Sequence, residues 1–190
     1  VLTVRDAATR TVANATVRHC DHEALQAAID QALKERRNVF FPTGFYRLAA
    51  GLVVSKPSGL ILEGSSGIDT VLDISEGEAP VLPQGAGACV SLIDGTDTTL
   101  RNFRMVGHTG FADSNKSSWI RLLGADRLWQ FWLNQCSAVS IFGTERVLVQ
   151  NCHATRMSGE AFYSSSGEGR SGLQETRAYP KSITWERCSV

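Results

Sequence analysis

The chain has 190 residues, 43% of them hydrophobic, and its 19 Lys and Arg balance its 19 Asp and Glu. This length suggests a single domain, and the apolar fraction is sufficient for a continuous core. The zero net charge gives no support for a nucleic-acid partner, which would require a basic surplus on one face. No run of about 18 apolar residues occurs, so we expect no membrane span. Residues 1–14 do not read as a signal peptide, but a leader could have been removed, so secretion stays open.

The cysteines are odd in number and widely spaced. No CxxC pair occurs, so neither a zinc site nor another metal or cofactor is expected. We expect free thiols that are buried as small apolar side chains. The five are Cys20, Cys89, Cys136, Cys152 and Cys188.

One segment is typical of an amphipathic helix. Asp21 is a good N-cap, and Asn38 is expected to end the helix. Between them, apolar residues recur with the 3.6-residue period of one helix face. These residues are Leu25, Ala28, Ile29, Ala32 and Leu33.

Residues 39–190 favour short strands instead. Apolar runs of a few residues alternate with Gly, Ser, Pro and Asp, which punctuate strands. No helical pattern separates them, as a βαβ fold would require.

Two patterns repeat along these strands. Residues 90–93, 120–123 and 139–142 each read apolar, polar, apolar, apolar, followed by Gly and then an acidic residue, which we interpret as turn-forming. Residues 100–103, 149–152 and 185–188 each read apolar, polar, polar, apolar. We expect Cys152 and Cys188 to stack in neighbouring coils as an interior ladder without a disulfide.

Repetition of this kind predicts a solenoid, in which stacked coils share one interior. The prediction is one domain over 1–190, with an N-terminal strand and capping helix in 1–38 and coils in 39–190. Residues 182–190 read as the start of a further coil without a cap, so we expect a fragment of a longer protein or a covering partner. The predicted core is Val90, Leu92, Leu100, Ile120, Leu122, Val139, Ile141, Val149 and Phe162.

Three motifs recur in order within the first 75 residues. Residues 24–30 read ALQAAID after an Asp cap, 38–47 read NVFFPTGFYR, and 59–64 read GLILEG. In their order and spacing they resemble the opening of the pectate-lyase-like superfamily. The segment 7–20 departs from the family, because it lacks the usual glycines. The resemblance implies a right-handed parallel β-helix, closed at one end by the helix, with a carbohydrate groove along one stacked sheet. It does not fix the function, since the family includes lyases, hydrolases, epimerases, phage tailspikes and members that only bind.

The family's catalytic signatures are not intact. Gly107-His108-Thr109 is the nearest match to the Gly-His-Gly of polygalacturonases, but no Asp pair precedes it. No carboxylate cluster suggests a calcium site, so no metal site is predicted.

Candidate site residues come from the strand repeat instead. The middle residues Ser91, Arg121, Ser140 and Tyr163 are expected to form one outward column. Arg121 could neutralise a sugar carboxylate, Tyr163 or His153 could act as base or acid, and a carboxylate pair with Glu160 would suit hydrolysis. Solvated or structural roles remain open for all of them. Substrate-binding candidates are His108, Asp113, Lys116, Trp119 and Arg156.

These residues favour a protein that cleaves or epimerises an acidic polysaccharide, with lyase chemistry slightly ahead of hydrolysis. The alternatives are a non-catalytic carbohydrate-binding or adhesive β-helix, such as part of a phage tailspike or surface protein, and a structural spacer. The expected partner is a polysaccharide, with no nucleic acid and no membrane, and a homotrimer stays open. An extracellular, virion or cell-surface location is favoured.

Overall fold

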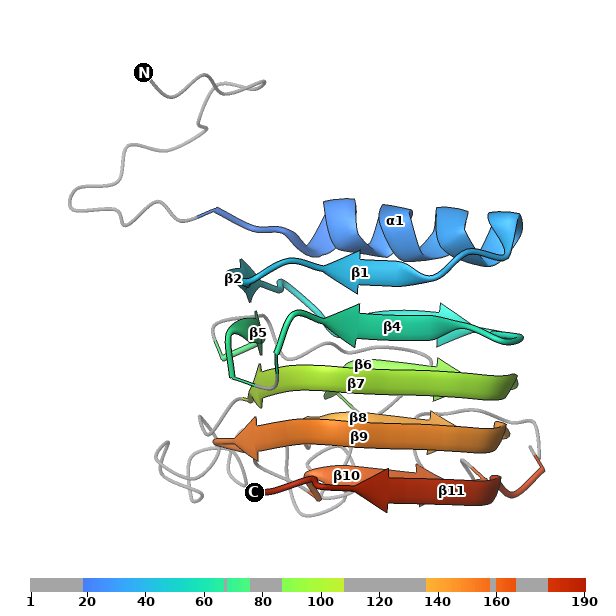
Figure 1. Ribbon diagram of the computed structural model, residues 1–190. Coiled ribbons are helices and arrows are strands. Elements are labelled where there is room, and N and C mark those ends of the chain that lie inside the picture. The colour runs from blue at the N-terminus through green and yellow to red at the C-terminus, as the bar shows by residue number, and fades with distance from the viewer. Residues whose placement is uncertain (1–18, 67, 76–86, 108–135, 158–159, 167–177) are drawn as a thin grey trace, which may run out of the picture.

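A computed structural model describes residues 19–66, 68–75, 87–107, 136–157, 160–166 and 178–190. One helix, α1 (His22–Glu35), lies across one end of a stack of strands (Figure 1). The strands are β1 (Val39–Phe41), β2 (Gly44–Arg47), β3 (Leu52–Ser55), β4 (Ile61–Gly64), β5 (Thr70–Asp73), β6 (Gly87–Ile93), β7 (Thr96–Val106), β8 (Cys136–Phe142), β9 (Glu145–Thr155), β10 (Phe162–Ser165) and β11 (Lys181–Glu186).

Helix α1 covers the first strands as predicted, but it ends earlier than expected. Arg36 adopts a left-handed conformation with φ 54°, which stops the helix before Asn38. Asp21 occupies the N-cap position, yet its carboxylate accepts a hydrogen bond from the Arg47 backbone instead of capping the helix. The Gln26 amide both donates to and accepts from the backbone of Val53, at 2.8 and 2.9 Å. The helix thereby satisfies part of the outer edge of β3, which would otherwise be open to pairing.

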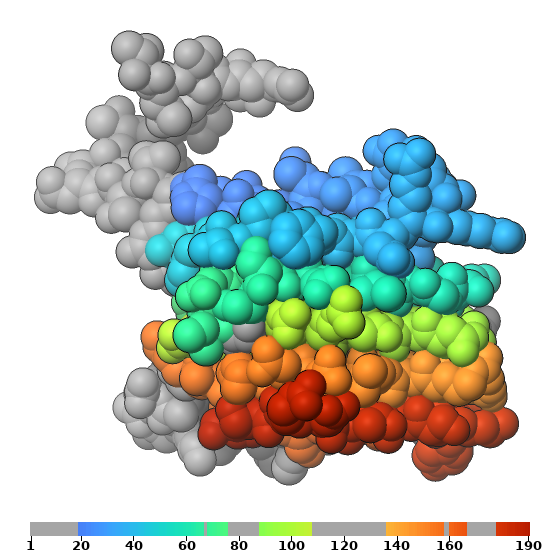
Figure 2. Space-filling model, in the orientation of Figure 1, coloured from blue at the N-terminus to red at the C-terminus, as the bar shows by residue number. Residues whose placement is uncertain are grey.

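All strand pairs in the described residues are parallel. One sheet has seven strands, in which β1, β4, β7, β9 and β11 follow one another. In the same sheet β5 pairs with the second half of β7, and β2 pairs with β5. The second sheet has the order β10-β8-β6-β3. Successive turns of the chain therefore lie above one another in sequence order, and Figure 2 shows the layers from the helix to β11. This mostly parallel β structure with one helix is consistent with a parallel β-helix.

The predicted registers of 90–93 with 139–142, and of 100–103 with 149–152 and 185–188, are confirmed. The expectation that 120–123 form a coil between the first two segments is wrong, because β6 pairs directly with β8. Val90 pairs with Val139 in the four-stranded sheet, and Leu100 and Trp185 both pair with Val149 in the seven-stranded sheet. The predicted core residues Val90, Leu92, Leu100, Val139, Ile141 and Val149 are buried, and Phe162 is partly buried against the same core. Ile120 and Leu122 lie outside the described residues.

The long strands β7 and β9 turn a corner at Asn102 and Asn151. Both asparagines have positive φ, 65° and 51°, a conformation that asparagine tolerates better than most residues. The Asn151 amide donates to the Asn102 side-chain oxygen at 2.9 Å, so the corners are stacked by a side-chain ladder. Each corner divides its strand into two halves that face different directions.

The cysteines follow the prediction with one exception. Cys89, Cys136 and Cys152 are buried and Cys188 is half-buried, all as free thiols, but Cys20 is exposed because it precedes the helix outside the core. Cys152 and Cys188 donate to carbonyl oxygens of the preceding coil at 3.8 and 3.5 Å, which confirms a ladder without a disulfide. Burial raises the pKa of the Cys152 thiol to about 12, so this thiol is protonated at neutral pH. No helix among the described residues is long and apolar enough to cross a membrane.

Candidate functional site

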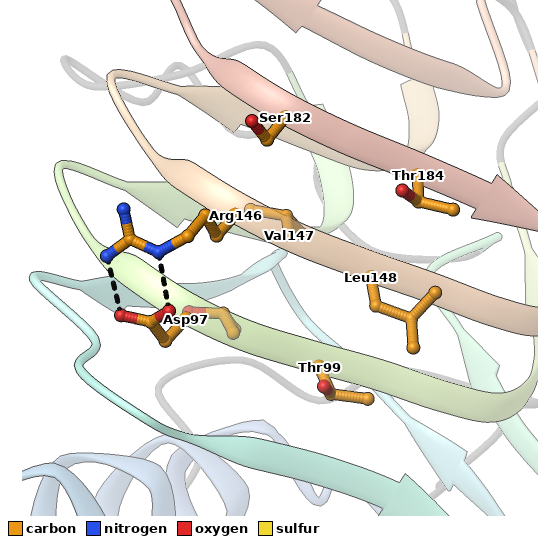
Figure 3. A pocket seen from close by; sticks show the side chains of 8 residues that line it. Asp97, Thr99, Arg146, Val147, Leu148, Ser182 and Thr184 are labelled. Carbon is orange, nitrogen blue, oxygen red and sulfur yellow. Dashed lines mark hydrogen bonds and ion pairs between the residues drawn. The ribbon is translucent and has the colours of Figure 1, made fainter.

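The outer face of β7, β9 and β11 carries an open depression of about 380 Å³ (Figure 3). It lies on the first halves of β7 and β9, before the asparagine corners, and crosses three successive coils. Its lining combines hydroxyl groups, an apolar patch and an ion pair. The lining residues are Asp97, Thr98, Thr99, Arg146, Val147, Leu148, Ser182 and Thr184.

One end of this groove holds a bidentate ion pair between neighbouring coils. Arg146 Nε lies 2.6 Å from Asp97 Oδ1, and a second guanidinium nitrogen lies 2.8 Å from Asp97 Oδ2. The hydrogen bonds to Arg146 lower the pKa of the Asp97 carboxyl, and those to Asp97 raise the pKa of the guanidinium. Both side chains are exposed, so the pair contributes little to stability. It does hold both charged groups at fixed positions on the groove wall.

The backbone shows why these side chains stand at the rim. Asp97, Arg146 and Ser182 have φ of 51°, 53° and 54°, at equivalent positions of three coils. Asn102 and Asn151 also have positive φ at equivalent positions of successive coils, so this conformation marks a corner of each coil. The stacked conformation turns three polar side chains toward one side of the groove.

The groove floor is a column of three residues in register. Thr99 pairs with Leu148, and Leu148 pairs with Thr184, so two hydroxyl groups flank one apolar side chain (Figure 3). The inward neighbours Thr98, Leu100, Val147 and Val149 are buried, as the two-residue period of a strand requires.

The next outward column is polar and internally paired. Arg101 contacts Glu63 at 2.8 Å, and the Gln150 amide donates to Glu186 at 2.9 Å. Phe40, in register with Glu63, is 62% exposed at the helix end of the column. The hydrogen bond to Glu63 raises the pKa of Arg101. Lys181 and Arg187 contact Glu145 and Glu186 at 3.2 and 2.8 Å, so charges across this face are matched.

Three members of the predicted column through Tyr163 are in register, without Arg121 between Ser91 and Ser140, and most of the column does not face solvent. Ser91, Ser140 and Tyr163 are in register in the four-stranded sheet. Ser91 and Ser140 are only 2% and 0% exposed, so the expectation that they form an outward binding surface is wrong. The described residues of β6 and β8 are buried on both faces, as in many parallel sheets. The alternation of polar and apolar residues does not by itself show which face of a strand is exposed to solvent. Tyr163 packs its ring against Phe142, with centroids 6.0 Å apart.

The other predicted catalytic residues are distributed over two regions. His153 lies on the second half of β9, in the seven-stranded sheet, whereas Tyr163 is in the four-stranded one. Arg156 and Glu160 are exposed in the segments after β9 and before β10. Their catalytic and binding roles stay predictions. Arg121, His108, Asp113, Lys116 and Trp119 lie outside the described residues, so the structure does not place them.

Sequence reasoning missed the groove residues. The sequence indicates only a turn at Asp97 and does not mark Arg146, because the two residues are far apart in sequence. The second repeat does contain the information, because it aligns residues 96–101 with 145–150. This alignment places the Asp97 carboxylate beside the Arg146 guanidinium. No group of three or more His, Cys, Asp or Glu side chains in the described part of the chain could hold a metal ion.

Comparisons with known proteins support the fold of the chain but do not assign the chain to a family. No family model matches the chain, and no curated protein matches it. Among solved structures, ORF18 of Geobacillus virus E2 matches with a TM-score of 0.54 and 14% identity, over 78% of this chain and 25% of that one. The chain thus spans about a quarter of the phage protein, and this likeness supports the fold alone.

Two further solved structures are less similar in shape. A candidate glycosyl hydrolase from Parabacteroides merdae matches with a TM-score of 0.45 and 9% identity, over 90% of this chain and 69% of that one. The surface protein and adhesin PfbA of Streptococcus pneumoniae matches with a TM-score of 0.34 and 15% identity, over 90% and 57%.

Proposed function

We propose that the chain is a segment of a right-handed parallel β-helix that binds an extended polysaccharide along the outer face of β7, β9 and β11. The observation that carries this proposal is the groove that crosses three coils, with Thr99, Leu148 and Thr184 in register on its floor. A surface that repeats from coil to coil suits a ligand that also repeats. Polysaccharides are the ligands of this kind that present hydroxyl groups and apolar ring faces in alternation.

The chemistry of the groove fits this ligand. Threonine and serine hydroxyls both donate and accept, so they can bond to sugar hydroxyls in either direction. The fixed Asp97 carboxylate adds acceptors and the Arg146 guanidinium adds donors, and Leu148 offers an apolar contact between the two threonines. Neighbouring strands lie about 4.8 Å apart, which is close to the length of one sugar unit in an extended chain.

The groove does not by itself select for charge. Arg101, Arg146, Lys181 and Arg187 each contact a carboxylate, so a bound chain would meet balanced charges. Recognition of hydroxyls is therefore the primary function we assign to this face. Cleavage or epimerisation of an acidic polysaccharide remains a proposal for residues beyond the groove, as does display on a virion or cell surface.

Removal of the two floor hydroxyls tests the proposal. The Thr99→Val, Thr184→Val double variant keeps the shape and strand preference of both residues but loses two hydrogen-bonding groups. At about 1 kcal/mol for each bond, we expect roughly a thirtyfold weaker affinity for the polysaccharide that binds best in a panel of neutral and acidic chains. Affinity electrophoresis or calorimetry gives the dissociation constants.

The control is Thr43→Val, which alters an exposed threonine in the turn between β1 and β2. It should leave the affinity unchanged. Equal affinities for wild type and the double variant would place the binding site elsewhere, and no binding across the panel would refute the proposal. Ultraviolet absorbance from unsaturated ends and release of reducing ends, followed in the same samples, would reveal a lyase or a hydrolase.

A further inference from the structure

A second outer face begins after the asparagine corners and carries a different set of side chains. Arg104 on β7 is in register with His153 on β9, and His153 forms a bridge with Ser189 in the following coil. Two potential hydrogen-bond donors, the Arg104 guanidinium and the His153 imidazole, thus stand on adjacent strands about 4.8 Å apart, and Ser189 lies beside His153 in the segment after β11.

Arg104 differs from the arginines of the groove face. Arg101, Arg146 and Arg187 each contact a carboxylate oxygen at 2.8 Å or less. Arg104 is exposed, and within the described residues it forms no ion pair. Its neighbour on the helix side is Val71 and on the other side His153, so neither flanking strand offers a carboxylate in register. No acceptor among the described residues occupies its five N–H donors, which are thus available to an external partner.

His153 is held in place beside it. Its Nδ1 atom lies 2.8 Å from Ser189 Oγ. When the serine hydroxyl donates to Nδ1, the proton of the neutral imidazole is on Nε2, which can donate to a ligand. The nearest carboxylate along β5 is Asp73, which is in register with Val106 and lies 3.9 Å from Arg47. The surroundings of Arg104 and His153 therefore favour a negatively charged ligand.

We propose that Arg104 and His153, the latter oriented by Ser189, form an anion-binding site for a carboxylate or sulfate group carried by a glycan. The planar guanidinium matches two oxygens of either group, and hydrogen bonds to charged partners are the stronger kind. The identity of the carrier as a glycan rests on the proposed function. The anion site itself stands on the oriented imidazole and on a guanidinium that no carboxylate of the described residues contacts, and it lies on another face than the groove.

Titration with small anions tests the site without a polysaccharide. The probes are sodium sulfate and sodium galacturonate, followed by NMR through the backbone amides and the His153 ring. We expect saturable shifts at residues 104, 153 and 189. Arg104→Ala should weaken the binding at least tenfold, since it removes the charge-assisted bonds. Arg104→Lys should retain part of the affinity, because a point charge remains without the fork geometry.

The matched control is Arg37→Ala, which removes the same charge from an exposed residue beyond the end of α1. It should leave both titrations unchanged. Equal anion affinities for wild type and Arg104→Ala, or an absence of saturable shifts at residues 104 and 153, would overturn the site. The same titrations with polygalacturonate and a sulfated polysaccharide then show whether the carrier is a uronate or a sulfate ester. The Thr99→Val, Thr184→Val variant should still bind sulfate, so failure of the groove and failure of the anion site give different results.

Discussion

Val149→Asp is expected to destabilise the stacked coils severely. Val149 is fully buried, and it pairs with Leu100 on one side and Trp185 on the other, at the centre of the shared interior. A carboxylate there would have no partner, and burying it costs several kcal/mol even if it takes up a proton. We expect a loss of more than about 4 kcal/mol, which is a large part of the roughly 5–15 kcal/mol that stabilises a typical domain. Urea unfolding followed by circular dichroism measures the change.

Leu148→Asp is the matched control, one residue away on the same strand. Leu148 faces the groove, where a carboxylate stays hydrated, so the cost should be about 1 kcal/mol or less. This difference follows from the two-residue period of β9. Similar losses for the two variants would contradict the inward and outward assignment of the strand.

Phe103→Ala is expected to cost about 3–5 kcal/mol, the second largest effect. Phe103 is fully buried just after the Asn102 corner, and its ring meets that of Phe41 edge-to-face with centroids 5.2 Å apart. Truncation of the Phe103 side chain would leave a cavity beside Phe41, between β1 and β7. The cost would appear as a lower midpoint in the same urea titration, with little change in slope.

Phe40→Ala provides the comparison, since the same atoms are removed from a ring that is 62% exposed. Its cost should stay within about 0.5 kcal/mol. If Phe40→Ala proved as costly as Phe103→Ala, the distinction between the outward and inward faces of β1 and β7 would be wrong.

The stacking of the coils could be predicted from sequence because equivalent positions in a parallel stack face the same environment. The register of residues 90–93 with 139–142, and of 100–103 with 149–152 and 185–188, follows from recurring apolar positions. The helix could be located because its apolar face has a 3.6-residue period. Its end could not, since Arg36 terminates it by a backbone conformation that no residue type signals.

The binding surface was harder to predict, for two physical reasons. Alternation shows which residues share a face but not whether that face is covered, so Ser91 and Ser140 were expected at the surface and are buried. The groove residues Asp97 and Arg146 meet only through stacking across coils, and each looks like an ordinary turn residue within its own segment. The predicted site residues of segment 108–121 lie outside the described residues and remain predictions.

The most direct test of polysaccharide binding on the groove face is the footprint of a bound oligosaccharide on the backbone amides, measured by NMR. The ligand would be an oligosaccharide prepared from the polysaccharide that binds best. We predict that the largest shifts fall on residues 97–99, 146–148 and 182–184, in three successive coils. Shifts confined to the four-stranded sheet of β3, β6, β8 and β10, or no shifts at saturating concentration, would contradict the proposed binding face.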